Sequence, residues 1–193
     1  MKITIFIVAF SAFVFSVQGE EPKVEDFSSG QIPQAWKGMK GAWAISDGAM
    51  SGKELAADNH GAVFMIPDPH TDSSFSCRFQ VNGAKGFGLS YNHEKGHLFR
   101  VRINAAGVQL SLDKDKKDPT SKPISFGKVD VEIEPGEWYD LTCTVKGDTV
   151  TVECAGEELS GTHEKLKMGK TGYRFTVAGE SVLVDDIAYA SAD

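Results

Sequence analysis

Residues 91–102 bring together side chains that can bind a ligand. The stretch contains six residues of this kind: Tyr91, Asn92, His93, His97, Arg100 and Arg102. Planar polar groups make paired hydrogen bonds to sugar hydroxyls, and an aromatic ring can cover the apolar face of a sugar. The pattern predicts a carbohydrate-binding surface. The alternative is a solvated strand face on which arginine stems cover apolar surface and the head groups pair with nearby carboxylates.

A strand over 98–104 would set the direction of the two arginines. Successive side chains of a strand point to opposite faces, so Phe99, Val101 and Ile103 fall on one face and the arginines on the other. The preceding strand, 86–91, is joined to this one by a short turn, and the two are expected to be neighbours in one sheet. The alternation of side chains does not decide whether the sheet face that carries the two arginines is concave or convex.

Two other groups of residues have types and spacings that could form a chemical site. His93 and His97 are four residues apart, but Gly96 between them indicates a turn, so the helical zinc arrangement does not apply. Histidines as general bases remain an alternative, because their pKa lies near neutrality. In the loop 113–123, three aspartates have calcium-like spacing, but three interleaved lysines compete with a cation. We therefore expect neither a metal site nor a cofactor.

The start of the chain predicts export. Lys2 precedes an apolar run from Ile3 to Val17, and small residues follow, which is the pattern of a signal peptide over residues 1–19. The run is shorter than a membrane span, so a secreted or periplasmic protein without a membrane span is expected. The formal net charge of -7 argues against a nucleic-acid partner. The oligomeric state stays open.

The cysteines have apolar neighbours two residues away and are expected in the core. If Gly147-Asp148 is a two-residue hairpin loop, Cys143 lies opposite Val152, and Cys154 lies opposite Leu141. The two cysteines are then diagonal and about 7–8 Å apart. Buried free thiols, with Cys77 as the third, are favoured over a disulfide.

The rest of the chain indicates an all-β protein with one domain over 20–193. Alternating apolar residues and glycine-rich turns predict about a dozen strands in an antiparallel β-sandwich. The expected strands include a hairpin over 43–52 with its turn at Asp47-Gly48, and then 62–66, 74–82, 86–91, 98–104, 107–112, 129–134, 138–146, 149–154, 158–162, 172–178 and 181–189.

Several of these motifs resemble those of the concanavalin A-like lectin/glucanase jelly roll. Within it, the chain is most similar to secreted bacterial domains classed as 3-keto-disaccharide hydrolase-like or laminin-G-like. The resemblance rests on Trp43-x-Ile45-x-Asp47-Gly48, Gly96-His97, Arg100-Val101, Gly136-Glu-Trp138-Tyr139, Lys146-Gly-Asp148, Gly172–Ser181 and Val184-Asp-Asp-Ile187. It implies a carbohydrate-binding domain, a hydrolase of 3-keto-disaccharides or related sugars, or a non-catalytic adhesive or scaffolding module.

Hydrolysis would need paired carboxylates. Jelly-roll glucanases place theirs as E-x-D-x-x-E on one strand, and this motif is absent. The nearest pattern is Asp130-Val-Glu132-Ile-Glu134, which puts three carboxylates on one face of the expected strand 129–134. Their mutual repulsion could raise one pKa toward that of a catalytic acid. The alternative is a solvated strand face, and carbohydrate binding is therefore the first hypothesis and hydrolysis the second.

Overall fold

Two long strands run through both layers of the molecule. The computed structural model describes residues 21–115 and 117–192. In it, β6 (Asp72–His93) and β13 (Lys170–Ala192) pair antiparallel along almost their whole length, with register shifts between Ala178 and Val182 and between Asp185 and Ala188. The first part of β6 pairs with β10 and its second part with β7, so one strand contributes to two sheets.

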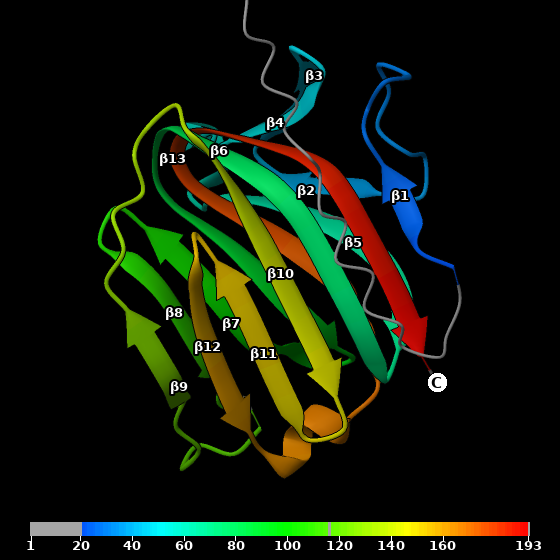
Figure 1. The fold of residues 1–193 in the computed structure, drawn as a ribbon, viewed down its shortest axis with the longest axis vertical. Helices are drawn as coiled ribbons and strands as arrows, with labels where there is room; N and C mark the ends of the chain where they lie inside the picture. The colour runs from blue at the N-terminus through cyan, green and yellow to red at the C-terminus, as the bar shows by residue number, and fades with distance from the viewer. Residues whose placement is uncertain (1–20, 116, 193) are drawn as a thin grey trace, which may run out of the picture.

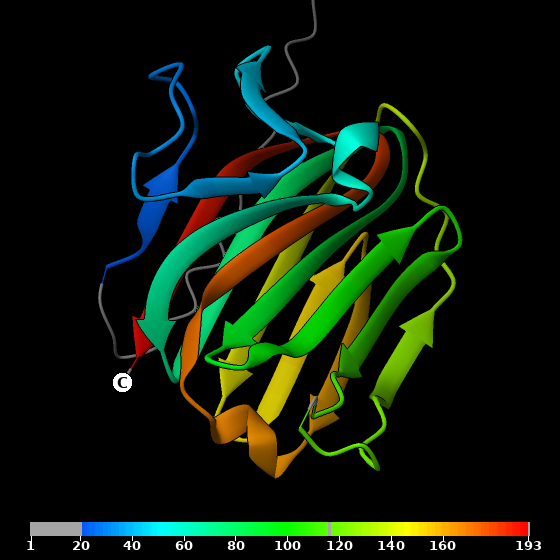
Figure 2. The same ribbon diagram turned by 180° about the vertical axis from the view of Figure 1, so that it is seen from behind.

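The two sheets pack face to face as an antiparallel sandwich. Figure 1 shows the sheet that contains β10, and Figure 2 shows the sheet that contains β7. The β10 sheet joins the two long strands to β1 (Lys23–Glu25), β10 (Trp138–Lys146), β11 (Thr149–Cys154) and β12 (Glu157–Thr162). The β7 sheet joins them to β2 (Lys37–Lys40), β5 (Ala62–His70), β7 (Gly96–Asn104), β8 (Gly107–Leu112) and β9 (Ile124–Val129).

Three short elements complete the fold. The hairpin of β3 (Ala42–Ser46) and β4 (Ala49–Lys53) pairs with the middle of β13, where that strand passes from one sheet to the other. Two 3-10 turns, η1 (Ala56–Asp58) and η2 (Glu164–Lys167), connect strands. No helix among the described residues is long and apolar enough to cross a membrane.

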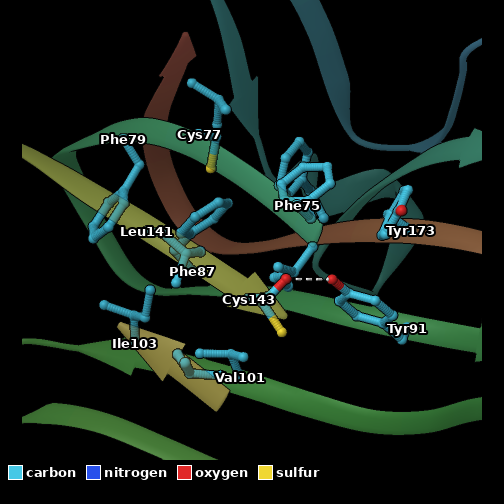
Figure 3. Close-up of a cluster of buried hydrophobic side chains, with 14 of the residues drawn as sticks. Phe75, Cys77, Phe79, Phe87, Tyr91, Val101, Ile103, Leu141, Cys143 and Tyr173 are labelled. Carbon is cyan, nitrogen blue, oxygen red and sulfur yellow. Dashed lines mark hydrogen bonds between the residues drawn. The ribbon is translucent and has the colours of Figure 1, made fainter. Parts of the chain in front are cut away.

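The core lies between the sheets and follows the alternation of the strands. Phe75, Cys77 and Phe79 from the first part of β6 are at most 2% exposed. They face side chains of the β7 sheet such as Val101 and Ile103 (Figure 3). Burial of apolar side chains at this depth stabilises a fold by about 1.5–3 kcal/mol each. The predicted all-β sandwich is confirmed.

Most predicted strand positions agree with the structure, and the differences are the following. The hairpin turn at Asp47-Gly48 and the register of β10 with β11 are as predicted. The strand predicted over 129–134 is wrong, because β9 ends at Val129 and the residues after it are not in a strand. The segments 74–82 and 86–91, predicted as two strands, are parts of one bent strand, β6. The segments 172–178 and 181–189 are likewise parts of β13. β1 and β2 were not predicted. The predicted signal peptide, 1–19, lies outside the described residues.

The cysteines are buried and free, as the hairpin register indicated. Cys143 lies opposite Val152, and Cys154 lies opposite Leu141. Burial raises the pKa of the Cys143 and Cys154 thiols to about 12. It also raises the pKa of Cys77 well above its usual value. The native protein therefore keeps its thiols protonated at neutral pH.

We expect these thiols to be unreactive in the folded protein. At pH 8, a thiol-disulfide exchange reagent should label none of the three within minutes, because the thiolate is the nucleophile and all three are inaccessible. The same reagent in 8 M urea should label all three. Labelling of only one thiol after unfolding would show that two of the cysteines form a disulfide.

Candidate functional site

The outward side of the β7 sheet carries a cluster of arginines, which we call the arginine face. Its central strand is the second part of β6, flanked by β13 on one side and β7 on the other. The arginine face consists of Met65, Gly88, Ser90, Asn92, His97, Arg100, Arg102, Ser111, Asp113, Arg174 and Thr176.

Small residues form the floor of the arginine face. Ser90 lies directly opposite Arg100 on β7 and Arg174 on β13, and Gly88 lies opposite Arg102 and Thr176. A Cβ atom at Gly88 would come within 2.8 Å of the Thr176 hydroxyl, so the residue has no room for a side chain. Long arginine side chains therefore stand on both sides of a low central strand.

Arg100 is held by a carboxylate. Its Nε donates to Asp113 Oδ1 at 2.8 Å, and its second terminal nitrogen lies 2.6 Å from the same oxygen. Asp113 is 7% exposed, because it follows β8 directly and its backbone N–H donates to the Leu98 carbonyl. Two nitrogens of Arg100 thus share one oxygen of a largely buried carboxylate, and the hydrogen bonds are strengthened by charge on both partners.

Arg102 and Arg174 have neutral partners. Arg102 donates to the Ser111 hydroxyl at 2.9 Å. Arg174 donates through Nε to the Met65 sulfur at 3.1 Å and has a terminal nitrogen 3.2 Å from His97 Nε2. Partial burial lowers the pKa of both guanidinium groups, and the neighbouring Arg100 charge lowers it further.

A short hydrogen-bond network fixes His97. Its Nδ1 lies 2.9 Å from Asn92 Oδ1, and the Asn92 amide nitrogen lies 3.7 Å from the Met65 sulfur. With the proton on Nδ1, the ring donates to Asn92 and accepts from Arg174 through Nε2. The network therefore orients Arg174 from two sides, through His97 and Met65.

The structure brings four of the six predicted site residues to this face. Asn92, His97, Arg100 and Arg102 lie there, whereas Tyr91 does not. Tyr91 is 0% exposed, points into the core, and donates its hydroxyl to the Cys143 carbonyl at 2.9 Å (Figure 3). The reason is the strand period, which places it opposite to Asn92.

His93 also lies apart from the arginine face. It is the last residue of β6 and faces the turn, where burial and then Lys95 lower its pKa. Sequence reasoning missed Arg174 and Asp113. The alternation of Arg174 with Tyr173 and Phe175 is a signal that could have marked it as outward, but only the pairing of β13 with β6 brings it beside Ser90.

The other sites considered in the sequence do not assemble. Asp130, Glu132 and Glu134 are exposed residues after β9, and Asp130 pairs with Lys128. Within the described residues, no group of three or more histidines, cysteines or carboxylates could hold a metal ion.

A pocket near the β2 edge is lined by aromatic side chains together with polar atoms. It has a volume of about 370 Å³ and no charged side chain in its lining. Trp36, Trp43 and Phe64 form much of its wall. It could accept an apolar group or the face of a sugar, but it lacks acid or base groups for catalysis.

A polar cluster is enclosed between the strands β5, β6 and β13. His70 stacks on Tyr173 with ring centroids 4.9 Å apart, and its Nδ1 lies 2.6 Å from the Asp68 carbonyl oxygen. His70 Nε2, Tyr173 OH and Ser73 Oγ are buried and have no protein partner. Lys170 is anchored nearby by the Leu166 and Met168 carbonyls at 2.6 and 3.1 Å.

Comparison with solved structures shows the fold. The carbohydrate-binding module CBM66 from Bacillus subtilis is 11% identical, with a TM-score of 0.65 over 81% of this chain and 96% of that one. The Crh5 transglycosylase in complex with NAG is 9% identical, with a TM-score of 0.69 over 91% and 86%. The chain has a jelly-roll fold.

Comparison of sequences does not assign the chain to a family. The CBM2 module of the evolved Dit protein of Lactobacillus casei BL23 phage J-1 is again similar in structure, with a TM-score of 0.64 over 90% of this chain and 99% of that one, at 12% identity. No protein-family model matches the chain, and no curated protein matches its sequence. These likenesses are therefore likenesses of fold.

Asp113 should stabilise the protein through Arg100. We expect Asp113→Asn to lower the free energy of unfolding by about 1–2 kcal/mol, because it leaves a charged group without its partner. Asp130→Asn is the matched control, and it should cost under about 0.5 kcal/mol because its pair with Lys128 is exposed. Urea titration measures both. Equal losses would show that the Arg100–Asp113 pair is no stronger than a surface pair.

His70 should make the fold sensitive to acid. Burial lowers its pKa, Lys170 lowers it further, and Asp68 opposes the shift. Its folded pKa is below the unfolded value, so its contribution to stability is complete above pH 6.5 and is lost as pH falls below that value. The loss is at most about 1.4 kcal/mol per pH unit.

Urea titrations between pH 7.5 and 5.0 test this. The free energy of unfolding of the native protein should fall more steeply than that of His70→Phe, in which all other titratable groups remain. Parallel pH profiles would show that His70 does not carry the acid sensitivity.

Proposed function

We propose that the protein is a carbohydrate-binding domain and that the arginine face is its binding surface. The observation that carries the proposal is the low floor of Gly88 and Ser90 between rows of partly exposed planar polar side chains. Such side chains bind sugar hydroxyls in pairs. The names of two structural neighbours, CBM66 and the CBM2 module, support the same function.

Hydrolysis has less support from the geometry. Glycoside hydrolysis by the common route needs two carboxyl groups about 5–9.5 Å apart. Asp113 is the one carboxylate among the residues that make up the arginine face, and Arg100 holds it. The 3-keto-disaccharide hydrolase alternative would therefore need another site or another route.

The described residues give little support to an adhesive or scaffolding role. Such a role favours a contiguous apolar patch of several hundred Å². The large exposed apolar side chains of the described residues, among them Val24, Met39 and Ile124, come from separate strands. Export, which residues 1–19 predict, would bring the domain to polysaccharides outside the cytoplasm.

A substitution that fills the floor tests the proposal. We expect Ser90→Tyr to abolish the retardation of the protein in gels that contain a bound polysaccharide, because the new ring would occupy the space between Arg100 and Arg174. A panel of plant, bacterial and algal polysaccharides is screened first with the native protein, and thermal melting confirms that each variant is folded.

Thr142→Tyr is the matched control. Thr142 is an outward residue in the middle of the β10 sheet, opposite Ser76 and Glu153, and the substitution adds the same ring to the other side of the molecule. It should leave binding unchanged. Binding that survives Ser90→Tyr but is lost in Trp43→Ala would assign the sugar to the pocket near the β2 edge. Absence of binding across the whole panel would refute the proposed function.

A further inference from the structure

The arginine face has more positive charge than its own carboxylates neutralise. It carries Arg100, Arg102 and Arg174, and Asp113 pairs with the first of them. Among the described residues, neither Arg102 nor Arg174 has an ion pair with a carboxylate. The whole chain has a formal net charge of -7, so this local excess of positive charge is opposite to the sign of the molecule.

The present partners of these two arginines are uncharged acceptors. A guanidinium group has five N–H donors, whereas Arg102 donates to one serine hydroxyl and Arg174 to a thioether and an imidazole. A thioether is a poor acceptor for a charged donor. Both side chains therefore retain donors that can turn to a ligand without breaking an ion pair.

The surroundings also disfavour the charge on these groups. Burial and the neighbouring charge of Arg100 lower the pKa of Arg102 and of Arg174. A negatively charged ligand would offset both effects, because it supplies opposite charge where water is partly excluded.

Ser90 is an independent sign of a ligand. Its hydroxyl is buried, with the residue 1% exposed, and it has no hydrogen-bond partner among the residues that the structure describes. Leu89 and Tyr91 face the core, so Ser90 points to the arginine face, directly between Arg100 and Arg174. Buried hydroxyls in proteins nearly always have a partner, and a ligand on the arginine face would supply one.

We propose that the arginine face binds an acidic glycan whose carboxylate or sulfate groups are held by Arg102 and Arg174, with the Ser90 hydroxyl donating from the floor. The proposal rests on the proposed function and names its substrate class. β13 and β7 are two strand spacings apart, about 10 Å, so the two side chains reach one ligand from opposite sides. The planar guanidinium fork fits a carboxylate and a sulfate equally well.

Two matched polymer pairs separate charge from sugar. Polygalacturonate is compared with its methyl ester, and dextran sulfate with dextran, by isothermal titration calorimetry at 50 mM and 500 mM NaCl. We expect at least one acidic polymer to bind about tenfold or more tightly than its neutral partner at low salt, with the difference reduced at high salt. The two pairs distinguish a carboxylate ligand from a sulfate ligand.

Charge-removing variants place the contact. Arg102→Gln and Arg174→Gln should each weaken binding of the acidic polymer about tenfold, because each removes a charged hydrogen bond. Lys146→Gln is the control, since it makes the same change of charge at the end of β10 in the other sheet. It should leave the affinity unchanged.

The outcomes separate this proposal from the one it rests on. Neutral polymers that bind as tightly as their acidic partners would overturn the acidic ligand and leave carbohydrate binding intact. Equal losses in Lys146→Gln and the two arginine variants would show a non-specific charge effect and would also overturn it. If no polysaccharide of the wider panel binds, the proposed function itself fails.

Discussion

The pairing of β6 with β13 is the constraint on which the rest of the structure depends. These two strands run beside each other from Gly172 and Asn92 at one end to Ala192 and Asp72 at the other. Every other sheet strand attaches to one of them directly or through one or two intervening strands. Because both strands bend where the register shifts, the two sheets share a covalent and hydrogen-bonded connection. The sandwich is therefore one continuous ladder folded over its core, and not two separate sheets.

The same pairing creates the candidate site. Arg174 and Ser90 are 84 positions apart in the sequence, yet they are direct partners in the ladder. β7 then adds Arg100 and Arg102 on the other side of β6. The arginine face thus consists mainly of side chains on regular strands, whose positions are fixed by backbone hydrogen bonds. A surface of this kind is more rigid than one formed by loops.

Local patterns in the sequence predicted local structure well. The alternation in residues 98–104 and the Gly147-Asp148 turn gave the inward residues of β7 and the register that separates Cys143 from Cys154, because both depend on neighbours within a few positions. The continuity of β6 and β13 was missed, since the glycines near 83 and 179 look like turns in sequence and are instead bends within a strand.

The candidate site was predicted only in part for the same reason. Arg100 and Arg102 were recognised from their own strand, whereas Arg174 needs a pairing between distant segments that no local period reveals. Tyr91 was grouped with its neighbours by sequence proximity, although the strand period sends it into the core. Asp113 was considered as part of a cation loop, and its actual partner, Arg100, is a residue of the opposite charge.

The alternation of β6 has an evolutionary consequence. Leu89 and Tyr91 keep the core together, while Gly88 and Ser90, one position away, determine the shape of the outer surface. Substitutions at Ser90 can change the outer surface without altering Leu89 or Tyr91, whereas Gly88 has no room for a side chain. Proteins only 9–12% identical to this chain share its fold, with TM-scores of 0.64 to 0.69, so the same backbone tolerates different residues on its outer surface.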